Sequence, residues 1–212
     1  MRPLPPLELP WTLKPLESAR TGLERLPGGR LRFWISHDVV RGVTPAMLVW
    51  WFQHLEGEME IAGQRHSRYR VWHPRDHHSL AYLKRLPDGS IGPGAKLRIR
   101  EFFGARPEHK IDITATIERL DEGGFVHRES VLGVEVGRMS YRFAAVAGGT
   151  LYENELVIGS PGPLGPVMNP LARALMFSEA KGRAWQLHNI EEVGAFEHFL
   201  PALHDAEVGG TS

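Results

Sequence analysis

The stretch from residue 111 to residue 125 reads IDITATIERLDEGGF, and it decides the fold class of this 212-residue chain. Its first seven residues alternate between apolar and polar side chains, which is the period of a β-strand with one buried face. The apolar set is Ile111, Ile113, Ala115 and Ile117. The turn at residues 121–124 reads DEGG, and its glycines suit the backbone angles of a tight hairpin. We therefore predict an antiparallel hairpin here.

Strand patterns continue on both sides of this hairpin. They extend from Lys96 to Ile158, and turns such as Gly148-Gly149 separate them. No helical period interrupts this series, so it predicts an antiparallel meander. A curved sheet of this kind needs another element to cover its concave face.

We expect the C-terminal segment to provide that cover. A loop rich in proline and glycine spans residues 160–166, and Asn169-Pro170 then offers an N-cap and a first helical residue. The helix is predicted to run from Pro170 to about Phe199. The pattern therefore indicates an α+β helix-grip fold, in which a curved antiparallel sheet wraps around a long C-terminal helix and encloses an internal cavity.

The first 30 residues contain repeated proline and glycine, so we expect an extended, proline-rich N-terminal arm over residues 1–30. A single helix-grip metal-binding domain is predicted over residues 31–205, followed by a flexible tail over 206–212. Within the domain, Leu31 to Ile35 has the composition of a short strand. Thr44-Pro45 then predicts a helix from Pro45 to about Met59.

The charge balance excludes several classes of partner. The chain has 25 basic and 25 acidic residues, which gives no broad attraction for nucleic acid or for an anionic membrane. No stretch approaches the roughly 20 apolar residues of a membrane span. We therefore expect a cytoplasmic protein that binds a small hydrophobic or aromatic substrate and binds neither nucleic acid nor membrane. A homodimer remains open.

Glu101 is an acid on an apolar face. Strand alternation places it on the same side as Leu97, Ile99 and Phe103, while the neighbouring basic residues point the other way. A buried carboxylate is costly unless a cation, a network of donors or a metal accompanies it. A strand end that is open to solvent, or an ion pair with an arginine, would also explain it.

Two histidines and a second glutamate complete a candidate metal site. His188 and Glu192 lie four residues apart in the predicted helix, so their side chains share one patch. His77 closes the run WHPRDH at residues 72–77. The chain has no cysteine, so a metal would need nitrogen and oxygen ligands; two imidazoles and two carboxylates suit zinc, with ferrous iron or manganese as alternatives. A surface His–Glu contact and a polar loop are the simpler interpretations of these two motifs.

Taken together, these motifs resemble the 2,4-diacetylphloroglucinol hydrolases. The resemblance covers roughly residues 45 to 200 and rests on the motifs above, on Tyr69 eight positions before His77, and on Phe103-Gly104 after the strand. It implies a zinc-dependent carbon–carbon hydrolase with a Bet v 1-like helix-grip fold. The metal ligands that it implies are His77, Glu101, His188 and Glu192.

The resemblance also implies residues that act beside the metal. Tyr69 would present its hydroxyl to the substrate, and His73 would stand behind the ligands. The family's further histidine is expected near residues 140–142, where this chain has Ser-Tyr-Arg. His127, Tyr141 or Tyr152 could take its place. We therefore expect catalytic roles for Tyr69, His73 and Tyr141.

The implied reaction removes an acyl group from a phenolic ring. The ring carbon would be protonated and water would attack the acyl carbonyl, while Tyr69 donates a hydrogen bond to a ring oxygen. Two other functions remain open at this point. One is a noncatalytic carrier of hydrophobic ligands, and the other is an iron oxygenase that uses two histidines and one carboxylate.

Overall fold

The computed structural model describes residues 1–131, 134–163, 165–175 and 177–209. Its helices are α1 (Pro45–Gln53), α2 (Arg68–Trp72), α3 (Gly165–Leu175) and α4 (Glu179–Gly209). Its strands are β1 (Ala19–Leu26), β2 (Arg30–His37), β3 (Val40–Arg41), β4 (Glu58–Ile61), β5 (Gln64–Ser67), β6 (His77–Lys84), β7 (Lys96–Phe102), β8 (Lys110–Asp121), β9 (Gly124–Val131), β10 (Val134–Val146) and β11 (Gly149–Ile158). Short 3₁₀ turns lie at Leu16–Ser18, Pro27–Gly29, Phe103–Ala105 and Pro107–His109.

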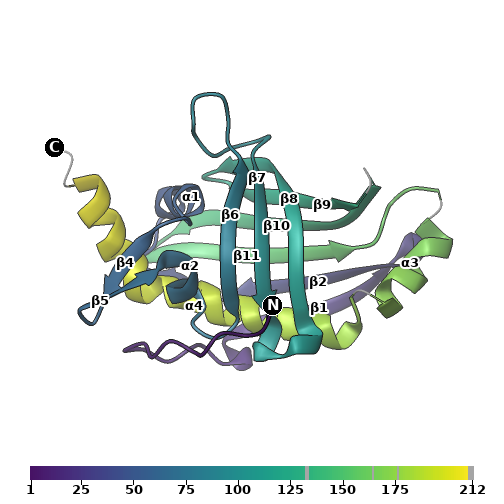
Figure 1. Cartoon of the computed structure of the whole chain (residues 1–212), viewed down its shortest axis with the longest axis horizontal. Coiled ribbons are helices and arrows are strands. Elements are labelled where there is room, and N and C mark those ends of the chain that lie inside the picture. Colours follow the sequence, from purple (N-terminus) through teal and green to yellow (C-terminus); the bar gives the residue numbers. More distant parts are fainter. Residues whose placement is uncertain (132–133, 164, 176, 210–212) are drawn as a thin grey trace.

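One antiparallel sheet dominates the fold, with the order β1-β2-β11-β10-β9-β8-β7-β6, and β3 pairs with β11. The predicted meander from Lys96 to Ile158 is confirmed, because each of the strands β7 to β11 pairs with the next. Figure 1 shows α4 passing along the sheet, from the end that carries α3 to the end that carries α1 and the β4–β5 hairpin. This is the expected α+β helix-grip arrangement.

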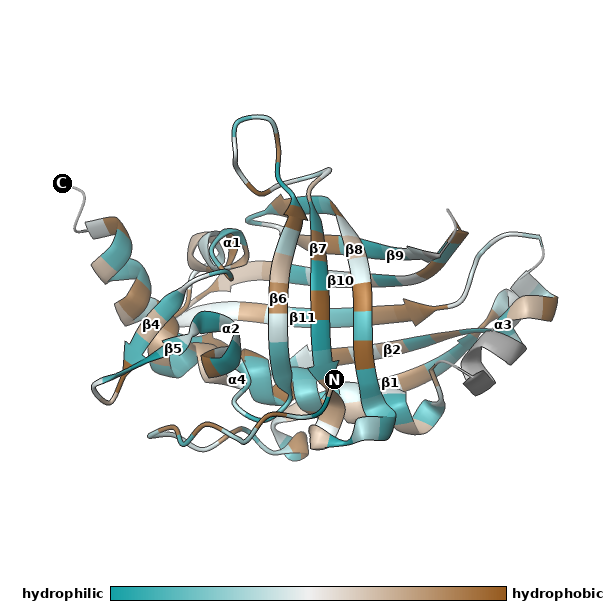
Figure 2. Ribbon diagram, viewed as in Figure 1, coloured by the Kyte–Doolittle hydropathy of each residue, from teal (hydrophilic) through white to brown (hydrophobic). Residues whose placement is uncertain are grey.

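The alternation that predicted the sheet also positions the core. Brown and teal segments alternate along β6, β7 and β8 in Figure 2, as expected for strands with one apolar face. From the helical side, Trp51 of α1 and Phe196 of α4 are both fully buried, and their rings contact each other. Trp51 is therefore a core residue, whereas Trp50 is half-buried beneath the guanidinium of Arg68.

The predicted C-terminal helix is in fact two helices. Within the described residues, α3 ends at Leu175 and α4 begins at Glu179. The side chain of Ser178 accepts a hydrogen bond from the backbone N–H of Lys181 (3.2 Å), so Ser178 caps a new helix start. The second helix continues beyond Phe199 to Gly209, through Pro201.

Two other predicted boundaries also differ. The helix from Pro45 ends at Gln53 rather than near Met59, because Met59 is a buried residue of β4. The predicted N-terminal arm is not separate from the domain along its whole length, since residues 19–26 form β1 at the edge of the main sheet. Residues 206–209 of the predicted tail belong to α4, and residues 210–212 lie outside the described part.

The first residues of the arm lie against the loop before β6 and against α4. The backbone N–H of Leu7 donates to the carbonyl of Pro74 (3.1 Å), and the Trp11 ring stacks on His198 at a centroid distance of 5.3 Å. In the described part of the chain, no helix is both long and apolar enough to cross a membrane.

A glycine sets the distance between α4 and the sheet. Gly182 is buried, and a Cβ atom at this position would lie 2.1 Å from the ring of Phe33 in β2. Real side chains do not approach so closely, so the helix packs on the sheet here only because residue 182 has no side chain.

We predict that Gly182→Ala destabilises the fold by about 1–3 kcal/mol, because the overlap with Phe33 outweighs the better helix propensity of alanine. Urea unfolding followed by circular dichroism measures the change. Gly209→Ala, in the last turn of the same helix, is the control, since nothing lies within 4 Å of a Cβ added there. Equal stability of the two variants would contradict this packing argument.

Candidate metal centre

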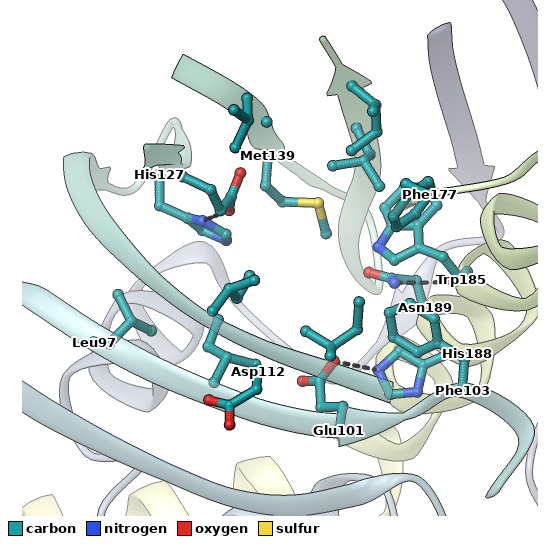
Figure 3. Close-up of a pocket in the computed structure, with 18 of the residues that line it drawn as sticks. Leu97, Glu101, Phe103, Asp112, His127, Met139, Phe177, Trp185, His188 and Asn189 are labelled. Carbon is teal, nitrogen blue, oxygen red and sulfur yellow. Dashed lines mark hydrogen bonds and ion pairs between the residues drawn. The ribbon is translucent and has the colours of Figure 1, made fainter. Parts of the chain in front are cut away.

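A cavity of about 410 Å³ lies between the sheet and α4. Its wall is mostly apolar and includes Leu97, Met139 and Phe177, which Figure 3 shows around the opening between the layers. The polar side chains in the wall come from α2, β7, β8, β9, β10, the loop after β11, α3 and α4. Those that are deeply buried need an explanation, because polar groups in an apolar wall usually bind a ligand or a partner.

The four predicted ligands converge at one side of this cavity. His77 Nε2 lies 3.5 Å from Glu101 Oε1 and 3.3 Å from Glu192 Oε2. His188 Nε2 lies 3.7 Å from Glu101 Oε2 and 3.6 Å from Glu192 Oε2. All four residues are buried.

Pairing of neighbouring elements produces this arrangement. His77 is the first residue of β6, not a loop residue as predicted, and it stands opposite Glu101 in the antiparallel register with β7. His188 and Glu192 are separated by one turn of α4, which faces these two strands across the interior. The predicted placement of Glu101 on the face of Leu97, with its side chain in the cavity wall, is confirmed.

Hydrogen bonds behind the two histidines determine which ring nitrogens face the centre. His77 Nδ1 donates to the backbone carbonyl of Tyr69 (2.6 Å), and His188 Nδ1 donates to Asp76 Oδ2 (3.1 Å). Both Nε2 atoms therefore point toward the two glutamates. His77 Nε2 is a buried atom without a hydrogen-bond partner among the described residues, so its lone pair is free for a ligand.

Asp76 is the anchor of this arrangement. Its two carboxylate oxygens accept hydrogen bonds from the backbone N–H groups of Gly104 (2.7 Å) and Ala105 (2.9 Å), in addition to those from His188 and from Arg75 Nε (3.1 Å). Every one of these contacts brings a donor, so Asp76 is held as an ionised acceptor and fixes the ring of His188.

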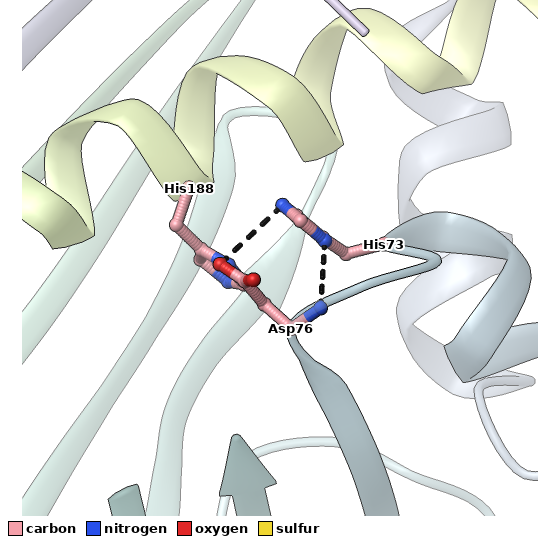
Figure 4. A group of neighbouring side chains, drawn as sticks. All are labelled: His73, Asp76 and His188. Carbon is pink, nitrogen blue, oxygen red and sulfur yellow. Dashed lines mark hydrogen bonds and ion pairs between the residues drawn. The ribbon is translucent and has the colours of Figure 1, made fainter. Parts of the chain in front are cut away.

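A second cluster, His73 with Asp76 and His188, also has the composition of a metal site (Figure 4). Its hydrogen bonds argue against that role. His73 Nδ1 accepts the backbone N–H of Asp76 (3.1 Å), so the ring proton is on Nε2, which lies 3.0 Å from Glu191. Neither nitrogen of His73 offers a free lone pair. His73 also stacks on the His188 ring, with centroids 4.5 Å apart.

The electrostatic field at the centre favours positive charge. Burial opposes protonation of His188, but its hydrogen bond to Asp76 and the charges of Glu101 and Glu192 outweigh burial and raise its pKa to about 9. Burial raises the pKa of Glu192 well above its ordinary value, and it also raises the pKa of Glu101. Burial, followed by the charge of His188, lowers the pKa of His77 well below its ordinary value. A cation at this point would relieve the cost of the buried carboxylates.

The predicted catalytic residues occupy different positions. Tyr69 lines the cavity, and its hydroxyl donates a hydrogen bond to Glu101 Oε1. Tyr141 also lines the cavity, and its hydroxyl has no hydrogen-bond partner among the residues that the structure describes. His73 is fully buried behind His188 and does not form part of the cavity wall. It is placed to orient its neighbours rather than to contact a substrate.

Sequence reasoning assigned no role to Asp76 or to Glu129 of β9, and it named His127 of the same strand only as one possible replacement for the family's further histidine. Asp76 lies in the run at residues 72–77, and no local signal relates it to the distant Gly104-Ala105 turn or to His188. His127 and Glu129 are both buried and both line the cavity. Strand alternation after Phe125 places them on the inner face, so the rule that identified Glu101 would have found them.

A chain of buried amides supports α4 behind the cavity. His37 Nε2 donates to Asn154 Oδ1, Asn154 Nδ2 donates to Asn189 Oδ1 (2.6 Å), and Asn189 Nδ2 donates to the carbonyl of Trp185 (3.0 Å). Asn189 lines the cavity next to His188. Burial lowers the pKa of His37 to about 4, although its hydrogen bond to Asn154 opposes that change.

Residues 12–98 match the family described as the DAPG hydrolase PhiG domain. This match confirms the resemblance inferred from the sequence. The matched range includes Tyr69, His73 and His77, and it ends before Glu101. The inclusion of Glu101, His188 and Glu192 in the cluster therefore rests on the distances given above. A comparison with curated protein sequences finds no match.

Solved structures that resemble the chain have low sequence identity to it. The solution structure of KanY protein is 9% identical, with 86% of this chain and 95% of that chain covered and a TM-score of 0.51. Ara h 8.0201 is 15% identical, with 80% of this chain and 100% of that chain covered and a TM-score of 0.46. A START superfamily protein from Mycobacterium smegmatis is 14% identical, with 77% of this chain and 97% of that chain covered and a TM-score of 0.43. The sheet order and the similarity to KanY protein confirm the expected helix-grip fold.

We predict that Asp76→Asn lowers the free energy of unfolding by about 2–4 kcal/mol, because the new NH₂ group must face two of the four hydrogen-bond donors around Asp76. The same change should weaken zinc binding about 10- to 100-fold, since the His188 ring loses its orienting carboxylate. Urea unfolding and zinc titration measure the two effects.

The control for this variant is Asp121→Asn. Asp121 is exposed and pairs with Arg119 at 2.8 Å, so the same chemical change should cost less than about 1 kcal/mol. If Asp76→Asn behaved like Asp121→Asn in both measurements, Asp76 would not be the anchor of this site.

His37 makes stability depend on pH. Its folded pKa of about 4 lies below the ordinary value of 6.5, so the unfolded chain takes up this proton first as the pH falls. The contribution of neutral His37 is fully present above pH 6.5 and is lost toward pH 4, a decrease of up to about 3 kcal/mol. Urea unfolding at several pH values should show a smaller decrease for His37→Gln, and an unchanged pH profile would contradict this assignment.

Proposed function

We propose that this chain is a zinc-dependent hydrolase that cleaves a carbon–carbon bond in an acylated phenol or a related aromatic polyketide. The observation that carries the proposal is the convergence of His77, Glu101, His188 and Glu192 at one side of an apolar cavity, whose wall includes the last three of them. The match of residues 12–98 to the DAPG hydrolase family supports the reaction class.

The four side chains fit a zinc ion. Donor atoms at about 2.0–2.2 Å from a tetrahedral zinc ion lie about 3.3–3.6 Å from one another, and the four His–Glu separations here are 3.3–3.7 Å. His77, His188 and Glu192 each bring one donor atom within 4.8 Å of the others, whereas Glu101 faces the two histidines with different oxygens, so it would turn to offer one of them to the ion. His77 also presents an unpartnered, buried Nε2 atom to this point. Two neutral imidazoles and two carboxylates would balance the charge of a divalent ion, which favours a buried site.

When bound, zinc would supply Lewis-acid polarisation of the substrate's acyl carbonyl. His77, Glu101, His188 and Glu192 would hold it. Ferrous iron or manganese would fit the same nitrogen and oxygen donors, so the choice of zinc is part of the proposal.

Two tyrosines would bind the phenolic ring. Burial raises the pKa values of Tyr69 and Tyr141 well above the ordinary value of 10.0, so both hydroxyls remain protonated at neutral pH and act as hydrogen-bond donors. Tyr69 is fixed by Glu101, and Tyr141 faces the cavity from β10 with its hydroxyl unpaired among the described residues. Tyr141 is placed to stabilise negative charge on a ring oxygen, and Tyr69 would join it when zinc replaces its hydroxyl as the partner of Glu101.

The proposed reaction consumes one water molecule. The bond between the ring carbon and the acyl carbon breaks, the ring carbon gains a proton, and the acyl carbon gains the hydroxyl group of water. The products are the deacylated phenol and a carboxylic acid. The apolar cavity wall would restrict the entry of further water and strengthen the hydrogen bonds from Tyr69 and Tyr141.

We predict one equivalent of zinc per chain and cleavage of hydroxyaryl ketones. The variant His188→Ala should lose at least about 100-fold in zinc affinity and lose the cleavage activity with it, because the ligand and its link to Asp76 are both removed. Elemental analysis and chromatographic detection of the released acid measure these outcomes.

His66→Ala is the matched control, because His66 lies in the β4–β5 hairpin and does not line the cavity. This variant should retain both zinc and activity. If the wild-type protein bound aryl ketones, held no zinc and released no acid after zinc was supplied, the chain would be a carrier of hydrophobic ligands. Oxygen consumption coupled to substrate loss would instead indicate an iron oxygenase.

A further inference from the structure

A second polar position lies in the cavity, on β9. His127 and Glu129 alternate with outward-facing residues, so both point inward, and both line the cavity. Their exposed fractions are 5% and 8%. Figure 3 shows His127 on a different wall of the cavity from His188 and Glu101, beside Met139. This pair is thus separate from the metal centre.

The pair is not explained by structural hydrogen bonding. His127 Nδ1 lies 2.8 Å from Glu129 Oε1 without the geometry of a hydrogen bond, and no other polar partner of either side chain occurs among the described residues. The remaining ring nitrogen and carboxylate oxygen are therefore available. Two ionisable groups buried in an apolar wall cost free energy that apolar residues of similar size would not. A ligand that uses the free atoms would account for their presence.

The opposite strand leaves room for Glu129. Gly137 of β10 faces Glu129 in the register, next to a bulge between residues 135 and 137. A Cβ atom at position 137 would lie 2.6 Å from Glu129 Oε2. The absence of a side chain at Gly137 therefore permits the observed position of the carboxylate. Gly137 also lines the cavity, so the accommodation occurs at the cavity wall itself.

We propose that His127 and Glu129 form a subsite that binds a hydroxyl group of the substrate, on the side of the ring away from the acyl group. The carboxylate beside Nδ1 favours the proton on that nitrogen, which leaves Nε2 as an acceptor. An acceptor selects a group that can donate, such as a phenolic hydroxyl, over a hydrogen atom or a methyl ether. This assignment rests on the proposed function, because it takes the cavity as the substrate site.

The metal centre and the pair His127 and Glu129 would bind different parts of the substrate. The centre at His77, Glu101, His188 and Glu192 would receive the acyl group, and the pair on β9 would read the far side of the ring. The wall between them contains Phe125 and Tyr141, whose stacked rings lie 5.4 Å apart and offer aromatic surface to the ring of the substrate. The substrate class is then a hydroxyaryl ketone with at least one hydroxyl distant from the acyl group.

The test compares two probes, 2′,4′-dihydroxyacetophenone and 2′-hydroxyacetophenone, which differ only in the hydroxyl para to the acyl group. Binding of each to the full-length chain is measured by calorimetry, with and without a zinc chelator. Wild-type protein should prefer the dihydroxy compound about 5- to 10-fold. The variants His127→Phe and Glu129→Gln should lose this preference while binding the monohydroxy compound as before.

Gly137→Ala provides a second variant in which His127 and Glu129 are both retained. The added methyl group displaces the carboxylate, so the preference should also decrease in this variant. Thermal unfolding shows whether each variant is folded. His188→Ala should keep the preference even if it loses hydrolysis, so failure of the proposed activity is distinguishable from failure of the subsite. An unchanged preference in folded Glu129→Gln and Gly137→Ala proteins would overturn the proposal and leave the pair as a structural contact.

Discussion

The structure depends on a set of carboxylates buried in an apolar interior. Asp76, Glu101 and Glu192 are all nearly inaccessible to water, and such groups persist only where donors or cations compensate for lost hydration. Asp76 is compensated by backbone N–H groups and by His188. Glu101 accepts a hydrogen bond from Tyr69, and both Glu101 and Glu192 face two histidine nitrogens at 3.3–3.7 Å. This difference separates the anchor from the ligands, and it is the basis of the proposed metal site.

The fold places these charges by simple periodicities. The antiparallel register brings His77 beside Glu101, and one helical turn brings His188 beside Glu192. Only the second relation depends on local spacing; the first depends on the register between β6 and β7, and the resemblance to a known family supplied the set of four residues. The strand alternation was sufficient to predict the sheet that carries Glu101. The long-range contacts were not predictable in this way: the turn at residues 104–105 meets Asp76 because the chain reverses after β7, and no local pattern encodes that meeting.

Local sequence signals that oppose the overall pattern explain the errors in the predicted helices and strands. Apolar spacing continued from Pro170 to Phe199, but Ser178 offers a helix cap in the middle of that span and starts α4 there. Residues 19–26 lie between proline-rich and glycine-rich segments, yet they pair with β2 along their full length. The pair His127 and Glu129 obeys the same alternation as Glu101, and its prediction required only that the rule be applied to β9 as well as to β7.

The most direct test is a crystal structure of the zinc-supplemented protein, with anomalous diffraction recorded at the zinc edge. The account predicts a single strong peak at about 2.0–2.2 Å from His77 Nε2, His188 Nε2 and one oxygen each of Glu101 and Glu192. A peak between His73, Asp76 and His188 would contradict the account. So would the absence of any peak at the cavity when the four side chains remain in their present positions.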